Sequence, residues 1–254
     1  MHKERVAAER LIAASDGKFY GATSAGWSSG NVPNGNLFSV ASTGVYNMLY
    51  AFDGVHGYLE QATPMQHTNG KIYGLTVGSA PPNTSGGVLY SFDNGAPPFV
   101  ILMTRWGNAG NTVEILGSGL TGASSVNFGS APANFTVVSD SYMTVDVPVD
   151  GVSGQITVTT PSGVLASSRP FFVVPSISAI SPTSGPVGTQ VTIMGSGFTG
   201  ATLVKFGGVK APSFTVNSGS AITATVPAGA RTGKISVKTA GGNASSRAVF
   251  TVTP

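Results

Sequence analysis

The second half of this chain contains the same stretch of sequence twice, and this duplication limits the fold more than any other feature. GSGLTGASSVNFGS at residues 117–130 corresponds to GSGFTGATLVKFGG at 195–208, and SSRPFFVVP at 167–175 corresponds to SSRAVFTVT at 245–253. The repeat length is about 78 residues. Because a unit of this length can bury a small core of its own, the duplication predicts two similar domains in tandem.

Within each copy, apolar residues alternate with polar ones over short stretches. In the second copy Val191 and Ile193 flank Thr192, and the same alternation recurs at 235–238. Strict alternation interrupted by Gly, Pro and Ser is typical of half-buried antiparallel strands. About six or seven such strands in each copy predict an immunoglobulin-like β-sandwich. The pattern also predicts four phenylalanines as core anchors: Phe128, Phe206, Phe135 and Phe214.

The start of the second copy, ISAISPTSGPVGTQVTIMGSGFTGATLVKFGG, resembles the opening of an IPT/TIG domain. The positions that match the family pattern are Pro182, Gly185, Gly188, Thr189, Val191, Thr192, Ile193, Gly195 and Phe198. Pro and Gly suit a tight entry turn, and Gly195–Ser196–Gly197 is expected to leave its strand with positive φ. The first copy keeps Gly107, Gly110 and Val113 but lacks the Ser-Pro pair, so its first strand is expected to be less regular.

This resemblance implies an Ig-like fold in both copies, with domains at residues 97–175 and 176–254. It implies no particular chemistry, because the same fold carries many different functions. Members of the family act in cell-surface receptors, as accessory modules of bacterial exported and polysaccharide-active proteins, and as dimerising modules of some transcription factors.

A different repeat occupies the first part of the chain. SDGKFYG at residues 15–21 recurs as TNGKIYG at 68–74, and the similarity extends over about residues 9–54 and 62–95. Asp-Gly and Asn-Gly are typical of tight hairpin turns. The pattern resembles the GloVer-type tandem repeat of large bacterial surface proteins, which implies propeller-blade-like units of three or four strands. We therefore expect residues 1–96 to form two propeller-like β repeats.

Two repeats leave the arrangement of their faces open. A blade buries its faces against neighbours, and a closed propeller needs about four blades or more. Three arrangements would cover these faces. The repeats are the tail of a longer array, or they pack on the Ig-like domains with Trp106 near the junction, or copies of the chain associate through open β edges. MHKERVAAER lacks a signal peptide's apolar core, so the chain is expected to be mature, truncated or cytosolic. The same observation favours the first arrangement. A self-sufficient sheet of about seven or eight strands is the alternative.

Composition supports an all-β protein, with N-terminal propeller-blade-like repeats followed by two tandem Ig-like β-sandwiches. Charged residues make up only 9% of the chain and hydrophobic residues 41%, a balance unlike that of a disordered chain. The chain has no cysteine, which excludes disulfides and thiolate chemistry. It also has no run of 18 apolar residues that would predict a membrane-spanning helix.

Positive charge is concentrated in the last third of the chain, where residues 176–254 contain no Asp or Glu. The basic side chains of this segment are Lys205, Lys210, Arg231, Lys234, Lys238 and Arg247. They are either solvated positions on a polar sheet face or a surface that meets an anionic polymer or a cell wall. Only fold analogy and this charge would support a nucleic-acid partner, and we do not expect one.

Catalytic, cofactor-binding and metal-binding patterns are missing from the sequence. His2, His56 and His67 lie far apart along the chain, and Asp53, three residues before His56, is better placed to set a turn than to form a catalytic dyad. The glutamates are scattered, whereas a glycosidase needs two opposed carboxylates. The acidic turn residues lack the dense spacing that a calcium loop requires. We therefore expect a protein that is not an enzyme and that carries no cofactor.

Aromatic residues in loops are the remaining candidates for ligand binding: Trp27, Tyr46, Tyr58 and Trp106. An exposed ring can stack on a sugar, although the same side chain can also fill a junction between units. We expect a non-enzymatic extracellular or cell-surface protein for adhesion or scaffolding, with a polysaccharide or a cell-surface protein as partner. The alternative is an accessory carbohydrate-binding region of a polysaccharide-active enzyme whose catalytic domain is absent from this chain.

Overall fold

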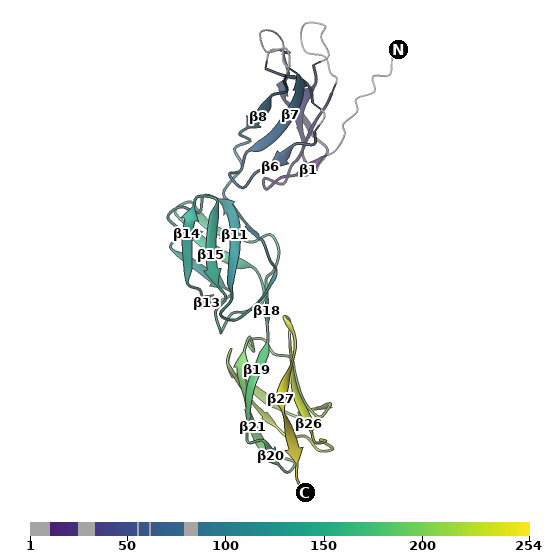
Figure 1. Ribbon diagram of the computed structural model, residues 1–254, viewed down its shortest axis with the longest axis vertical. Coiled ribbons are helices and arrows are strands. Elements are labelled where there is room, and N and C mark those ends of the chain that lie inside the picture. Colours follow the sequence, from purple (N-terminus) through teal and green to yellow (C-terminus); the bar gives the residue numbers. More distant parts are fainter. Residues whose placement is uncertain (1–10, 25–33, 55, 61, 79–85) are drawn as a thin grey trace, which may run out of the picture. The chain divides into compact units, whose positions relative to one another are not determined.

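The protein divides into two compact units, residues 1–98 and residues 99–254. All regular secondary structure in the described residues is β-strand, as the alternation of the sequence predicts (Figure 1). The computed structural model describes residues 11–24, 34–54, 56–60, 62–78 and 86–254. Within these ranges, no helix is long and apolar enough to cross a membrane.

The described part of the first unit consists of short antiparallel strands in two sheets. The first sheet has the order β1-β2-β3-β4, with strands β1 (Ile12–Ala13), β2 (Phe19–Ala22), β3 (Asn36–Val40) and β4 (Tyr46–Ala51). In the second sheet the central strand β7 pairs with the other three, and the strands are β5 (Tyr58–Glu60), β6 (Met65–Gln66), β7 (Ile72–Gly78) and β8 (Leu89–Phe92).

Each repeat contains the tight turn that its Asp-Gly or Asn-Gly pair predicts. Gly17 lies between β1 and β2 with φ +78°, and Gly70 lies between β6 and β7 with φ +86°. The Oδ1 atoms of Asp16 and Asn69 accept the backbone N–H two residues later, at 3.2 Å and 3.1 Å. These described residues build two small sheets and no closed ring, so the propeller stays a prediction.

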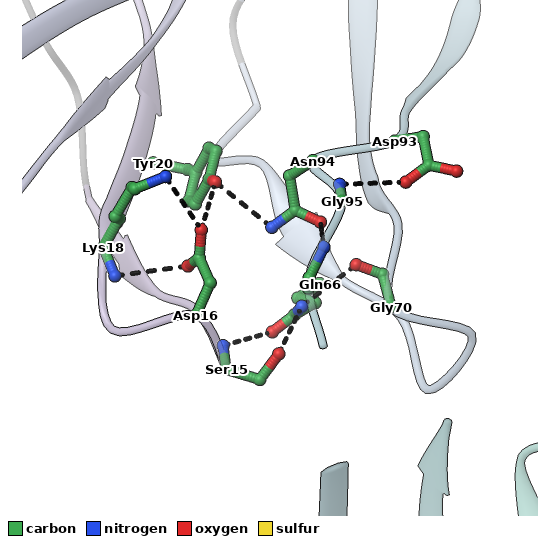
Figure 2. Close-up of polar contacts among 10 residues, drawn as sticks. Ser15, Asp16, Lys18, Tyr20, Gln66, Gly70, Asp93, Asn94 and Gly95 are labelled. Atoms are coloured by element: carbon green, nitrogen blue, oxygen red, sulfur yellow. Dashed lines mark hydrogen bonds and ion pairs between the residues drawn. The ribbon is translucent and has the colours of Figure 1, made fainter. Parts of the chain in front are cut away.

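The two sheets of the first unit pack against each other. Asn94 Nδ2 donates to Tyr20 Oη at 3.1 Å, and Gln66 Nε2 donates to Ser15 Oγ at 2.9 Å, so polar side chains from the two repeats join at this contact (Figure 2). Burial, together with the hydrogen bond that Tyr20 donates to Asp16, raises the pKa of Tyr20 to about 12. The largest buried side chains of this core are Tyr20, Leu37, Phe52 and Ile72.

The second unit begins with a sandwich that covers the first copy of the long repeat. Its sheets have the orders β14-β15-β11-β9 and β13-β12-β16-β17, and β10 and β18 pair separately in parallel. The strands are β9 (Phe99–Leu102), β10 (Trp106–Asn108), β11 (Thr112–Ser118), β12 (Ser125–Phe128), β13 (Ala131–Pro132), β14 (Phe135–Ser139), β15 (Tyr142–Asp146), β16 (Ile156–Thr160), β17 (Gly163–Ala166) and β18 (Phe172–Val174).

A second sandwich repeats this plan, with sheets β19-β21-β25-β24 and β20-β27-β26-β22-β23. The strands are β19 (Ser176–Ser181), β20 (Ser184–Gly185), β21 (Gln190–Ser196), β22 (Leu203–Phe206), β23 (Val209–Lys210), β24 (Phe214–Ser218), β25 (Ala221–Thr225), β26 (Gly233–Thr239) and β27 (Gly242–Val252). β20 pairs with β27 in parallel, as β10 does with β18. The duplication therefore gives two copies of one Ig-like fold, as predicted.

Each sandwich has a core of its own. Phe128 is fully buried in the first and lies edge-on to Phe171, with ring centroids 5.2 Å apart. Phe206 occupies the same place in the second and lies edge-on to Phe250 at 5.5 Å. The predicted anchors Phe135 and Phe214 are only partly buried and pack at the margin of the two cores. The two clusters of buried residues share no member.

The glycines at the strand exits serve a purpose that the sequence predicts only in part. Gly197 has φ +68°, as expected for a residue that leaves the strand in a left-handed conformation. Gly195 does not need positive φ; a Cβ there would overlap the carbonyl oxygen of Ser176 and the ring of Phe198. The expectation of positive φ for Gly195 is therefore wrong, since the residue is required by the close approach of β19.

The two sandwiches meet within the second unit through a short connection. Only Pro175 separates the end of β18 from the start of β19. Asp150 of the first sandwich accepts the backbone N–H of Gly219 at 2.6 Å, and Thr199 Oγ1 donates to the Asp150 carbonyl at 3.1 Å. A side chain at position 219 would overlap the backbone of Asp150. The second sandwich therefore uses a glycine at the point where the first one touches it.

A carboxylate organises the corresponding hairpin of the first sandwich. Asp140 accepts the backbone N–H groups of Gly119 and Thr121 at 3.0 Å and 3.2 Å. These hydrogen bonds, with the Gly119 N–H the largest contribution and the Thr121 hydroxyl next, hold the pKa of Asp140 below its usual value. The equivalent position in the second sandwich is Gly219, directly after the paired residue Ser218.

We expect acid to destabilise the first sandwich partly through Asp140. A carboxylate whose pKa is lower in the folded than in the unfolded state stabilises the fold above about pH 4, and this contribution is lost as the pH falls through the folded-state pKa. The melting temperature of the first sandwich should therefore fall between pH 7 and pH 3, and Asp140→Asn should make that fall smaller. Thermal unfolding by circular dichroism would measure both effects, and equal pH dependence of the two proteins would contradict the assignment.

Candidate functional site

The closest acid–imidazole pair of the described residues lies in a turn of the first unit. Asp53 Oδ2 and His56 Nδ1 are 2.7 Å apart, and Asp53 Oδ1 accepts the His56 backbone N–H at 2.7 Å. The imidazole is largely exposed, with 72% of the side chain accessible. Asp53 thus sets the turn, as the sequence indicates. Within the described ranges, no three His, Asp or Glu side chains lie close enough together to hold a metal ion.

An aromatic pair stands on the surface of the first sandwich. β10 and β18 run in parallel with Trp106 opposite Phe172 and Gly107 opposite Val173. Because side chains alternate between the faces of a strand, the buried Val173 points inward and Trp106 and Phe172 point outward. Their rings stack with centroids 4.3 Å apart and an interplanar angle of 20°, while Trp106 remains 54% exposed.

Arg105 completes this stack. Its guanidinium carbon lies 5.5 Å from the centroid of the Phe172 ring, within the range of a cation–π interaction. Arg105 Nε donates to the Pro170 carbonyl at 3.2 Å, and the Arg105 carbonyl accepts the Phe172 N–H at 2.7 Å. Hydrogen bonds from the side chain and to the backbone carbonyl of Arg105 therefore hold its guanidinium beside the aromatic pair.

A groove of about 370 Å³ lies beside this group, with Arg105 in its wall. Its other lining residues are Ile101, Leu102, Met103, Ser168 and Arg169. Ile101 and Met103 are 45% and 54% exposed, so apolar surface and a second guanidinium are available to a ligand here. We call Trp106, Phe172, Arg105 and the residues lining this groove the aromatic groove.

The second sandwich shows that the fold does not require the aromatic pair. There β20 and β27 make the same parallel pairing, with Ser184 opposite Thr251 where the first sandwich has Trp106 opposite Phe172. Small polar residues at these positions therefore allow the same pairing of the two strands. An exposed Trp–Phe stack offers a flat apolar surface, and guanidinium groups beside it can donate hydrogen bonds to hydroxyl or carboxylate oxygens.

The other aromatic candidates have different positions. Tyr46 lies on β4, 55% exposed, with its ring centroid 5.2 Å from that of Phe38. Tyr58 lies on β5, but its side chain is outside the described residues, as is the whole of Trp27. Of the two candidates whose side chains the structure describes, Trp106 stacks on Phe172 and directly follows Arg105, which lines the groove.

Four of the six predicted basic residues share one face of the second sandwich. Lys205 pairs directly with Lys210 across β22 and β23, and Lys234 and Lys238 alternate with buried residues along β26. Arg231 and Arg247 are also exposed. None of the six forms an ion pair with a described residue. Their role in binding an anionic polymer stays a prediction.

Sequence reasoning missed Phe172, Arg105, Arg169 and Met103 as members of a site. The duplication gives no signal for the first, because the correspondence of SSRPFFVVP with SSRAVFTVT places Phe172 opposite Phe250. Only the pairing of the strands shows that Phe172 takes the position of Thr251. The pairing of β10 with β18, which brings Phe172 to Trp106, could not be identified from spacing.

The model of a protein family described as the IPT/TIG domain matches residues 100–173 and 175–252. No curated protein sequence matches the chain.

Solved structures resemble the chain at low similarity. One is SGBP-B from a complex xyloglucan utilization locus in Bacteroides uniformis, with 20% identity and a TM-score of 0.31 over 61% of this chain and 49% of that one. Another is the surface glycan-binding protein PbSGBP-B from Prevotella bryantii, with 18% identity and a TM-score of 0.41 over 61% of this chain and 42% of that one. Murine CEACAM1b gives 15% identity and a TM-score of 0.24, over 62% of this chain and 99% of that one.

The chain thus spans less than half the length of the two bacterial proteins. At these identities and TM-scores, the likeness carries no argument about function.

Proposed function

Because the chain belongs to the IPT/TIG domain family, we propose that it is a non-enzymatic binding protein of the cell surface or the extracellular space, with polysaccharide as its ligand. The proposal places the ligand in the aromatic groove of the first sandwich. It agrees with the sequence-based expectation of a binding or scaffold protein, and it selects Trp106 from the aromatic candidates.

One observation carries this proposal: two copies of the same fold differ in whether they have the aromatic pair. Trp106 and Phe172 replace Ser184 and Thr251 at backbone positions that make identical parallel pairings. A tryptophan that is half exposed loses little hydration on folding, so it contributes less to stability than a buried one. An exposed aromatic pair that the fold does not need is therefore best explained by a ligand.

The chemistry of the groove suits a sugar polymer. The apolar face of a pyranose ring can lie on the free face of the Trp106 indole, which Phe172 holds in place from the other side. Arg105 and Arg169 can donate paired hydrogen bonds to neighbouring hydroxyl groups. A groove of about 370 Å³ is within the range of small-ligand sites, so one or a few sugar residues would occupy it.

The alternative function, an accessory region of a polysaccharide-active enzyme, would use the same groove. In that case the catalytic domain lies outside this chain, and the chain by itself still binds without hydrolysis. Incubating the protein with any polysaccharide that it binds and measuring released reducing ends tests for turnover, which we expect to be undetectable.

We expect Trp106→Ala to weaken polysaccharide binding by about 10- to 100-fold, because a central exposed aromatic anchor commonly contributes 1.4–2.8 kcal/mol or more. The full chain would first be screened on an array of neutral and acidic polysaccharides. Affinity for the best one would then be measured by isothermal titration calorimetry for the wild type and for Trp106→Ala and Phe172→Ala.

Two matched variants serve as controls for this experiment. Ser184→Ala changes the equivalent position of the second sandwich, and Tyr46→Ala removes the competing aromatic candidate of the first unit; both should bind like the wild type. The absence of binding to every polysaccharide, or unchanged affinity of Trp106→Ala, would refute the proposal. A loss caused by Tyr46→Ala alone would move the site to the first unit.

A further inference from the structure

The first unit exposes an apolar face on each of its two sheets. The face of the first sheet, which we call the leading face, consists of Leu11, Phe19, Tyr46 and Met48, each at least 40% exposed. The face of the second sheet, the trailing face, consists of Met65, Leu75, Val77 and Leu89, each at least 50% exposed. Contiguous apolar surface of this kind in a soluble protein commonly marks an interaction site.

The two sheets correspond residue by residue. Gly35 and Gly87 each lie so close to a threonine carbonyl, that of Thr23 or Thr76, that a Cβ would overlap it. In both repeats the residue after this glycine donates its N–H to the same threonine's hydroxyl at 3.0 Å. β2 therefore matches β7 with an offset of 53 residues, and β3 matches β8 with an offset of 52.

This correspondence identifies the two open faces as the two halves of one interface. Ile72 is 0% exposed where the second sheet meets the first, but its counterpart Phe19 is 40% exposed on the leading face. Leu37 is 1% exposed where the first sheet meets the second, but its counterpart Leu89 is 66% exposed on the trailing face. Each open face thus has a counterpart that is buried inside the same unit.

The interface inside the unit shows what each open face can bind. The first sheet presents Tyr20, Ala22 and Leu37 to the second sheet. The equivalent residues of the second sheet are Tyr73, Leu75 and Leu89, and the last two belong to the trailing face. The second sheet presents Ile72 and Tyr90 to the first sheet. Their equivalents in the first sheet are Phe19, which belongs to the leading face, and Phe38, whose ring lies against Tyr46 of that face. A leading face is therefore the natural partner of a trailing face.

We propose that the first unit associates head to tail, with the trailing face of one copy of the chain binding the leading face of a second copy in the way that its own two sheets bind each other. The contact is heterologous, because two different surfaces meet, so it can extend into an open array or close into a ring. It is a contact of sheet faces, in contrast to the association through open strand edges that was one of the three arrangements considered from the sequence.

The absence of charge on these strands supports this partner. β2 (FYGA), β3 (NLFSV), β4 (YNMLYA), β7 (IYGLTVG) and β8 (LYSF) contain no Lys, Arg, Asp or Glu. Exposed apolar surface that carries no charge is typical of a surface that another protein surface covers. The inference does not depend on polysaccharide binding, because the aromatic groove belongs to the second unit.

Two lysine substitutions test the head-to-tail contact in the full chain. Met48→Lys places a charge on the leading face only, and Leu89→Lys places one on the trailing face only. Sedimentation velocity over a concentration series should show oligomers for the wild type and a monomer for each variant, with the dissociation constant raised by about 100-fold or more because the charge would be buried without a partner.

Mixing the two variants is the decisive step. Met48→Lys keeps an intact trailing face and Leu89→Lys keeps an intact leading face, so an equimolar mixture should form a dimer that neither variant forms alone. Val249→Lys, on an exposed apolar position of the second sandwich, should associate like the wild type. Unchanged thermal unfolding would show that the variants fold, as expected for half-exposed positions.

Three outcomes would overturn the proposal. A wild-type chain that stays monomeric at high concentration would show that these faces do not bind a second copy. Association that persists in both single variants would place the contact on another surface. A mixture of the two variants that remains monomeric, while the wild type associates, would show that the two faces do not bind each other.

Discussion

Replacing Phe206 by alanine is expected to destabilise the second sandwich by about 3–5 kcal/mol and to leave the first sandwich unchanged. Phe206 is fully buried between the two sheets and lies edge-on to Phe250 at 5.5 Å. Its removal leaves a cavity that neighbouring strands, fixed by their hydrogen bonds, cannot fill. For a domain of about 80 residues the loss lowers the melting temperature by at least about 12 °C. Differential scanning calorimetry of the full chain should show only one transition moving.

Phe128→Ala is the matched variant, since Phe128 is equally buried and lies edge-on to Phe171 in the first sandwich. It should lower a different transition, and the double variant should show the sum of the two effects because the cores share no residue. The segment 176–254 expressed alone should fold cooperatively and respond to Phe206→Ala as in the full chain. If either substitution lowered both transitions equally, the two sandwiches would unfold as one unit.

The Ig-like part of the fold was predictable because its signals are local. The alternation around Thr192 and the glycine-rich strand exits occur within single strands and turns, and the duplication presents each of them twice. Period-two patterning fixes which side chains point inward, so Phe128 and Phe206 could be assigned to the core. What the pattern does not give is distance between strands, and for this reason it assigned Gly195 a positive φ in place of a close backbone contact.

The first unit was predictable in its turns and not in its faces. Asp16-Gly17 and Asn69-Gly70 predict their hairpins because tight hairpin turns require positive φ, which glycine adopts at positions 17 and 70. The exposure of a side chain depends on whether another sheet covers it, and the sequence of one repeat does not show which of its faces is covered. Phe19 and Ile72 occupy equivalent positions in the two motifs, yet one is exposed and the other is buried.

The aromatic groove depends on contacts between residues that are distant in the sequence. Trp106 was recognised as a candidate because it is a large aromatic residue in a polar context. Phe172 and Arg105 gained meaning only when the parallel pairing of β10 and β18 placed them beside it. A comparison of the two sequences places Phe172 opposite Phe250, and only the pairing of the strands shows that Thr251 takes its position in the second copy.

Gly117→Ala is expected to destabilise the first sandwich by about 2–3 kcal/mol, although it adds only one methyl group. Gly117 lies on β11 where β9 passes, and a Cβ there would overlap the carbonyl oxygen of Phe99, which is fixed in the ladder between these strands. To accommodate the methyl group, the two strands must separate, and this weakens the hydrogen bonds on both sides. The equivalent change Gly195→Ala should act in the same way on the second sandwich, where the overlap is with Ser176 and Phe198.

Gly154→Ala provides the control within the same sandwich. A Cβ on Gly154 would have no atom within 4 Å, and its φ is not positive, so alanine fits without strain and reduces the freedom of the unfolded chain. We expect this variant to be as stable as the wild type or slightly more stable, by up to about 1 kcal/mol. Urea unfolding of the three glycine variants would measure the differences. Equal losses for Gly117→Ala and Gly154→Ala would mean that backbone flexibility, and not the close approach of β9, selects glycine at position 117.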